Sequence, residues 1–312
     1  MALSHDPLWP RAGAWPAFEG EADAVLLGVP TWRTSLSPTG AHATPSAVRE
    51  ALQRYSPTLM GPPAVDLDAV LAIRDAGDVE EPDGDDGEAT TIARVRELSP
   101  AFVIALGGDN SLTYPVALGA AASGLITFDA HFDLRDGISN GTPVRRLVED
   151  APAAATVPTE RIDPRRIVQI GIADFANSAA YAQRAADWGI RVITLNEVRR
   201  RGVDDVVAEA LEVAGATDGR VHLDVDVDVC DRSVAPGCPA SVPGGLAAWE
   251  LRALARAVAA DHRVGSADIA EVDATSDAED GRTLRLAALC VLELLAGVAA
   301  RKDGATRVRA PH

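Results

Sequence analysis

Short apolar runs rich in Val, Ile and Leu alternate along the chain with longer stretches of helical periodicity. The apolar runs predict strands at Ala24–Val29, Phe102–Leu106, Leu125–Phe128, Ile167–Ile170, Val192–Leu195, Val221–Val229 and Ser266–Val272. The stretches between them predict helices at Ser46–Tyr55, Glu88–Leu98, Tyr114–Ala122, Ser178–Trp188, Val203–Ala214, Leu246–Ala260 and Leu284–Val298. Strands that alternate with helices in this way predict βαβ units and an α/β fold with a mostly parallel sheet.

Polar motifs follow four of the predicted strands. Gly107–Asn110 and Asp129–Asp133 each come directly after a strand, Asp226–Asp231 ends a third strand, and Glu271 closes a fourth. Ligands of a parallel α/β sheet bind outside the carboxyl ends of its strands. We therefore expect these motifs to meet in one site.

Composition and charge narrow the class of protein. No linker divides the 312 residues, so we predict one domain over residues 1–312, with a disordered polar tail from about residue 301. The formal net charge of −17 argues against a nucleic-acid or membrane partner, and we see no apolar run near the ~20 residues of a membrane span. A disulfide framework is not expected from three cysteines, which favours a cytoplasmic location.

Two clusters of acidic residues indicate a metal centre. Asp129, His131 and Asp133 are spaced two apart, so an extended chain projects them to the same side. Residues 224–228 alternate Asp with Val on a predicted strand, where Asp is depleted and three carboxylates on one face repel each other unless a cation neutralises them. A solvent-facing edge strand is the alternative, but the alternating valines require a buried opposite face.

The combined set of side chains favours particular ions. It consists of four carboxylates and one imidazole, from Asp129, His131, Asp133, Asp226 and Asp228. Such an oxygen-rich set is unlike a structural zinc site and suits two hard or borderline divalent ions such as Mn²⁺. Two such ions activate water and polarise an electrophile, so the site predicts a hydrolase.

Five motifs occur in the order found in a known family. They are G-G-D-N-S (107–111), D-A-H-F-D (129–133), D-V-D-V-D-V-C-D (224–231), A-P-G-C-P-A-S-V-P-G-G-L (235–246) and A-E-V-D (270–273). With shorter matches upstream, the chain resembles the ureohydrolase (arginase/agmatinase) superfamily over nearly its whole length. The resemblance implies a three-layer αβα fold, two Mn²⁺ per subunit, a small-molecule substrate and a homo-oligomer (a trimer or hexamer).

The resemblance also implies roles for single residues. Asp129 and Asp226 match residues that bridge the two ions, and Asp133 matches a ligand of one ion. His131 and Asp228 match ligands of the other. Glu271 matches the carboxylate that holds an amidine-type head group, and Asp133 is the candidate that carries a proton to the leaving nitrogen.

Departures from the superfamily motifs indicate the branch. Asn110 stands where a metal-binding His is usual, so the ion next to it is expected to bind weakly. Asn140 stands where a His relays protons, and an amide cannot do so near neutral pH. Asp224, where Ser is common, is a milder departure.

With all the acids retained, the pattern resembles the formimidoylglutamase branch, which hydrolyses N-formimino-L-glutamate to L-glutamate and formamide. The alternatives are an agmatinase or guanidino-acid amidinohydrolase that releases urea, and a catalytically silent paralogue.

The substrate's carboxylates require a positive partner. Arg135 follows the metal motif and is the first candidate for a bidentate contact; its alternative role is a salt bridge to Asp136 or to a carboxylate that binds the metal. Arg145 is a second candidate, unless it is a surface charge, and Asn140 and Thr142 are expected to hydrogen-bond the substrate. We expect His222 to point away from the aspartates and to pack in the core.

Overall fold

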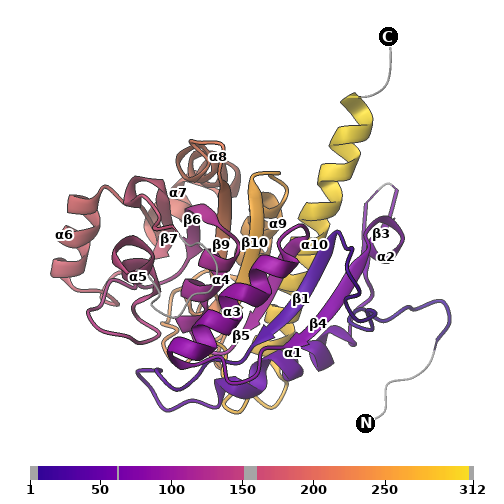
Figure 1. The fold of residues 1–312 in the computed structure, drawn as a ribbon, viewed down its shortest axis with the longest axis horizontal. Helices are drawn as coiled ribbons and strands as arrows, with labels where there is room; N and C mark the ends of the chain where they lie inside the picture. The colour runs from indigo at the N-terminus through magenta and orange to yellow at the C-terminus, as the bar shows by residue number, and fades with distance from the viewer. Residues whose placement is uncertain (1–5, 62, 151–159, 309–312) are drawn as a thin grey trace.

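The computed structural model describes residues 6–61, 63–150 and 160–308 and has an eight-stranded parallel sheet at its centre (Figure 1). The strands are β1 (Ala24–Val29), β4 (Ile73–Asp78), β5 (Phe102–Gly107), β6 (Ala122–Phe128), β7 (Ile167–Ile172), β8 (Arg191–Thr194), β9 (Arg220–Asp226) and β10 (Val264–Ala270). Their spatial order is β4-β1-β5-β10-β9-β6-β7-β8. A small antiparallel pair, β2 (Thr58–Leu59) and β3 (Val65–Asp66), lies apart from this sheet.

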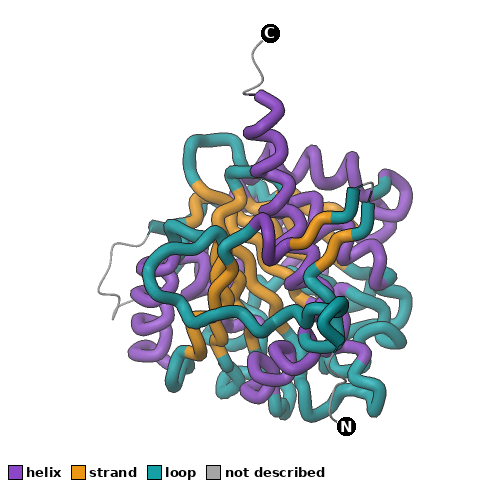
Figure 2. The backbone as a smooth tube through the Cα atoms, turned by 90° about the vertical axis from the view of Figure 1, so that its right-hand side faces the viewer, coloured by secondary structure: helices purple, strands orange, loops and turns teal. Residues whose placement is uncertain are grey.

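Helices cover both faces of the sheet, which confirms the three-layer α/β prediction. One face packs against α1 (Thr44–Leu52), α7 (Leu195–Arg201), α8 (Val203–Ala214), α9 (Ala248–Ala259) and α10 (Arg282–Val308). The other face packs against α3 (Gly84–Leu98), α4 (Thr113–Gly119), α5 (Pro143–Glu149) and α6 (Ala179–Trp188). Seen from the side, the strands lie in the interior among these helices (Figure 2). The short helix α2 (Leu67–Val70) follows β3.

Several element bounds differ from the sequence-based expectations. Strand β4 was not predicted because it is a half-exposed edge strand with a polar sequence, Ile-Arg-Asp-Ala-Gly-Asp. The predicted strand Val221–Val229 is too long, since β9 ends at Asp226 and Val227–Val229 form the 3₁₀ turn η4. Part of the predicted tail is helical, because α10 continues to Val308; residues 309–312 lie outside the described residues.

Helix α10 is the one helix among the described residues whose apolar segment reaches the length of a membrane span. By length and composition alone, Arg282–Lys302 would suffice to cross a membrane, which corrects the expectation that no apolar run reaches that length. However, 72% of its most apolar window is buried inside the protein, and a buried core helix passes the same test. The buried residues of α10 belong to the same hydrophobic core as those of α1 and α9.

The site lies where the strand order reverses. The chain passes from β5 to β6 across the positions of β10 and β9. Because these four neighbouring strands are parallel, they all end at the same edge of the sheet. Such a switch point is where parallel α/β sheets bind ligands. The turn after β5 is tight there: a Cβ at Gly108 would lie 2.0 Å from the Thr31 carbonyl oxygen, so only glycine fits.

Candidate metal centre and substrate pocket

The predicted acidic residues come together at this edge of the sheet. Asp129 directly follows β6, Asp226 is the last residue of β9, and Asp228 lies in η4. Register places Ala270, the last residue of β10, beside Asp226, so Glu271 emerges next to it. Residues 131–142, between β6 and α5, supply the remaining predicted side chains.

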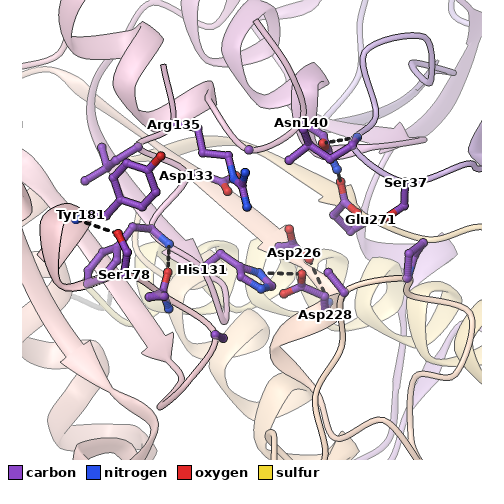
Figure 3. Close-up of a pocket in the computed structure, with 18 of the residues that line it drawn as sticks. Ser37, His131, Asp133, Arg135, Asn140, Ser178, Tyr181, Asp226, Asp228 and Glu271 are labelled. Atoms are coloured by element: carbon purple, nitrogen blue, oxygen red, sulfur yellow. Dashed lines mark hydrogen bonds and ion pairs between the residues drawn. The ribbon is translucent and has the colours of Figure 1, made fainter. Parts of the chain in front are cut away.

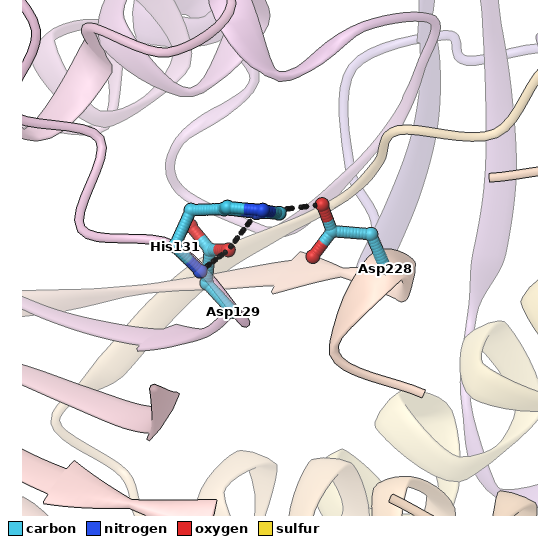
Figure 4. Close-up of side chains that lie close together, drawn as sticks. All are labelled: Asp129, His131 and Asp228. Atoms are coloured by element: carbon cyan, nitrogen blue, oxygen red, sulfur yellow. Dashed lines mark hydrogen bonds and ion pairs between the residues drawn. The ribbon is translucent and has the colours of Figure 1, made fainter. Parts of the chain in front are cut away.

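Three of these side chains form a compact cluster (Figure 4). One potential ligand atom from each of Asp129, His131 and Asp228 lies within 4.8 Å of the other two. His131 Nδ1 is 2.9 Å from Asp228 Oδ2 and 3.4 Å from Asp129 Oδ1. Asp129 Oδ2 is buried and has no hydrogen-bond partner among the described residues. A buried carboxylate oxygen without a partner is costly and indicates that the site receives a ligand.

The electrostatics of the cluster fit a cation. Burial and the charge of Asp228 raise the pKa of Asp129 to about 6. Burial and the charges of neighbouring acids also raise the pKa of Asp133 and of Asp226 well above the usual range. Burial lowers the pKa of His131, but Asp228 and Asp129 outweigh it and raise this pKa to about 12. Carboxylate oxygens with one imidazole are donors that suit Mn²⁺, so the residues present fit this ion.

Manganese is expected to stabilise the fold as well as the site. At a hundredfold excess over its dissociation constant, an ion that binds only the folded chain adds about 2.7 kcal/mol, or several degrees in Tm. Calorimetry of metal-free and Mn²⁺-loaded protein measures the shift, with Asp129→Asn as the matched variant in which it should shrink. Equal Tm values for the two wild-type samples would show that no ion binds the buried acids.

Asn110 is placed beside Asp133 but faces it with its amide nitrogen. Nδ2 donates to Asp133 Oδ2 over 2.8 Å, while Oδ1 accepts a hydrogen bond from Thr113 Oγ1 over 2.6 Å. In this orientation the Asn110 side chain holds Asp133 in place. The Asn110 amide oxygen could coordinate a metal ion only if the side-chain amide flipped to exchange its oxygen and nitrogen.

Glu271 is held from two sides. Its Oε1 accepts hydrogen bonds from the backbone N–H of Asn110 (2.8 Å) and from Asn140 Nδ2 (2.6 Å). Burial, with the charges of Asp109 and Asp228, raises the pKa of Glu271 to about 8 despite these two hydrogen bonds. A cationic partner would therefore stabilise its ionised form.

A cavity of about 460 Å³ opens over the acidic cluster (Figure 3). Its lining includes His131, Asp133, Asp226, Asp228 and Glu271. Arg135 and Asn140 line it too, so the structure brings most of the predicted site residues to one pocket. Asp129 and Asn110 lie behind this surface, fully buried.

Arg135 is the one arginine or lysine among the described residues that line the cavity. Its alternative role, a salt bridge with Asp136, is not what the structure shows, because Asp136 pairs with Arg184 at 2.9 Å. The Arg135 backbone is fixed instead: its N–H donates to Gly141 O (3.1 Å), and Arg145 Nε donates to its carbonyl oxygen (2.8 Å). The guanidinium is thus exposed toward the pocket on an anchored loop.

Two other predicted substrate contacts do not line the cavity. Thr142 is buried, and its hydroxyl donates to Ser139 O and accepts from the Ser139 N–H, closing a turn. Arg145 is buried below the loop, where it donates to Gly137 O and pairs with Glu149 and Asp150. The structure therefore places both side chains in the support of the Arg135 loop.

The segment after β7 was missed in the sequence, although its position at a strand end was a signal. Phe175, Ser178 and Tyr181 from this segment line the cavity. Asn177 accepts a hydrogen bond from the Phe132 N–H (3.0 Å) and donates to Ala130 O (2.8 Å), so it holds the backbone around His131.

His222 corrects an expectation. It was expected to point away from the aspartates, but residues 222, 224 and 226 share one face of β9 because alternate strand residues do. His222 is fully buried, with Nδ1 2.8 Å from Ser266 Oγ and Nε2 2.9 Å from Asp268 Oδ2. Its burial in the core agrees with the expectation.

Comparisons with known proteins find relatives that match this chain over most of its length. A family model described as the arginase family matches residues 22–297. The formimidoylglutamase of Bacillus subtilis (strain 168) is 33% identical over 291 residues, covering 88% of this chain and 86% of that protein. The agmatinase of Pyrococcus horikoshii is 28% identical over 296 residues, covering 90% of this chain and 93% of that protein.

Solved structures also align with this chain over most of its length. The crystal structure of formimidoylglutamase from Bacillus subtilis aligns with a TM-score of 0.85 at 30% identity, covering 96% of this chain and 94% of that one. The structure of Trypanosoma cruzi formiminoglutamase with Mn²⁺ aligns with a TM-score of 0.81 at 27% identity, covering 94% of this chain and 99% of that one.

Proposed function

This chain belongs to the arginase family, and we propose that it hydrolyses the C–N bond of N-formimino-L-glutamate to give L-glutamate and formamide. The observation that supports this substrate is that one cavity is lined by both Glu271 and Arg135, whose side chain is exposed. The formimino group is a cationic amidine that pairs with a carboxylate. The glutamate end carries two carboxylates, for which a planar guanidinium is the best-matched partner.

Three residues of the protein would each have a separate role in the reaction. Glu271 binds and orients the amidine, and Arg135 holds the glutamate end, so the amidine carbon is fixed over the acidic cluster. Asp133, buried at the cavity floor, would carry a proton from the attacking water to the leaving glutamate nitrogen. We propose that Thr142 and Arg145 act on the substrate only through the loop that carries Arg135.

The metal ions would be held by residues at the ends of two neighbouring strands, β6 and β9. Within a manganese-dependent family, we propose two Mn²⁺ per subunit, bound by Asp129, His131, Asp133, Asp226 and Asp228. When bound, the ions supply a water nucleophile that is deprotonated near neutral pH. The ion nearest Asn110 would bind weakly, because a neutral amide is a poorer ligand than imidazole and here faces Asp133 with its nitrogen.

Asn110→His is expected to tighten the weaker manganese site by about tenfold or more, since an imidazole nitrogen replaces a turned-away amide. Isothermal titration of the metal-free protein with Mn²⁺ resolves the two sites. Asn110→Ala is the control, because it removes the amide without adding a ligand. Unchanged affinity in the histidine variant would place residue 110 outside the coordination sphere.

Urea-releasing activity is the rival within the same family. Agmatine would bring its ammonium group toward Arg135, which is unfavourable, whereas a guanidino acid would not. Manganese-loaded protein assayed with formiminoglutamate, agmatine and 4-guanidinobutanoate separates the three substrates. Release of urea from either guanidino compound, with no glutamate from the first, would overturn the proposal. Four acids line one cavity (Asp133, Asp226, Asp228 and Glu271) and Asp129 lies buried behind it, which argues against a silent paralogue.

We further propose a cytoplasmic homo-oligomer, a trimer or hexamer, with no nucleic-acid or membrane partner. Two observations support this setting: Cys230, Cys238 and Cys290 are all free and buried, and the formal net charge is −17.

A further inference from the structure

Both ends of the Asn140 amide are already engaged inside the protein. Nδ2 donates to Glu271 Oε1 over 2.6 Å, and Oδ1 accepts from the Leu36 backbone N–H over 3.0 Å. The Asn140 backbone N–H donates in turn to Thr34 O, on the same segment as Leu36. Leu36 itself lines the cavity and is half exposed, so this segment forms part of the pocket rim. Asn140 therefore joins the rim to the carboxylate that we assign to the amidine.

The geometry at Glu271 is determined by its donors. Both hydrogen bonds, from the Asn110 N–H and from Asn140, go to Oε1, which leaves Oε2 for the pocket. The Glu271 backbone has a left-handed φ of 59° and its N–H donates to Gly108 O over 2.9 Å. Backbone and side chain are thus both constrained, as expected for a group whose direction matters to function.

We propose that Asn140 is a positioning residue, which fixes the Glu271 carboxylate for the amidine end of the substrate and makes no contact with the substrate's carboxylates. This inference rests on the proposed function only in assigning Glu271 to the amidine. It revises the expectation that Asn140 hydrogen-bonds the substrate, because its NH₂ group already donates to Glu271. It also gives the residue at this position a role other than proton relay.

The proposal is tested by comparing probes for the two ends of the substrate. Formamidinium carries only the amidine, and L-glutamate carries only the acidic end; binding of each to the manganese-loaded protein is measured directly by isothermal titration. Asn140→Leu keeps the approximate shape but removes the donor and the acceptor. Losing a hydrogen bond to a charged group predicts a dissociation constant for formamidinium about 10- to 100-fold higher, with that of L-glutamate unchanged.

A second variant separates positioning from a merely structural role. Asn140→His restores an N–H donor near the same place, so it should recover much of the formamidinium affinity that Asn140→Leu loses. Ile138→Ala, in the same loop, changes an exposed side chain outside the cavity lining. It leaves the Asn140 amide intact and is expected to bind both probes as the wild type does. Thermal unfolding of each variant shows whether any loss follows a weakened fold.

Three results would overturn the proposal. They are a rise in the L-glutamate constant equal to that of formamidinium, unchanged constants in Asn140→Leu, and loss in both Asn140 variants that tracks a lowered Tm. Failure of the proposed function is recognised separately. It appears in the wild type as an inability to release glutamate from formiminoglutamate, whatever the Asn140 variants do with formamidinium.

Discussion

Asp129→Asn is expected to lower kcat by about a thousandfold or more, since a bound metal supplies several kcal/mol of transition-state stabilisation. The asparagine keeps the size of the side chain but removes a charge from the centre of the cluster. Asp129 lies against His131 and has one buried oxygen that finds no hydrogen-bond partner in the part of the chain that the structure describes. Manganese content and kcat are therefore measured on the same preparation, and both should fall together.

The matched control is Asp136→Asn, which removes the same charge from an exposed acid of the same loop. Asp136 pairs with Arg184 and lies outside the lining of the cavity, so its loss should leave manganese content and kcat close to the wild-type values. An Asp129→Asn enzyme that retains both ions and most of its activity would contradict the assignment of this residue to the metal centre.

Arg135→Leu is expected to raise KM for formiminoglutamate by about 10- to 100-fold or more, because a charged hydrogen bond to substrate is lost. The chemical step involves the other end of the molecule, so kcat should change much less. The loop itself should persist, since its hydrogen bonds use the Arg135 backbone and the side chain of Arg145. Steady-state kinetics at saturating Mn²⁺ measure both constants.

Two comparisons sharpen this test. Arg135→Lys keeps the charge but not the planar fork, and should give an intermediate KM. Arg165→Leu makes the same chemical change at an exposed arginine outside the cavity lining and should leave KM unaltered. If Arg135→Leu raises the KM of agmatine as strongly as that of formiminoglutamate, Arg135 serves the general shape of the pocket instead of recognising acids.

Much of the fold follows from the sequence because parallel strands buried on both faces are nearly continuous apolar runs. Seven such runs were recognised, and each corresponds to a strand of the sheet. Edge strand β4 was not predicted because it is partly exposed and polar in sequence. The strand predicted for β9 was too long because valines continue into η4. Local pattern identifies buried strands well, but it does not distinguish a strand's last residues from a turn of the same composition.

The acids of the site were predictable for a related reason: aspartates on a buried strand have few explanations other than a cation. The contacts of Asn140 were not predictable. Its partners, Leu36 and Glu271, lie 104 and 131 residues away along the chain, and spacing carries no information about them. The same is true of Arg145, whose guanidinium is buried against loop carbonyls that no sequence pattern marks as its acceptors.

The backbone around the cavity also bears on the stability of the protein. Asp133, Phe175 and Glu271 line the cavity, and all three are among the five non-glycine residues with left-handed φ in the described parts of the chain. Each such residue costs about 1–2 kcal/mol that glycine would avoid. Glycine at any of these positions would relieve the backbone strain but would remove a side chain that lines the cavity. The walls of the pocket therefore carry a stability cost that the rest of the fold must offset.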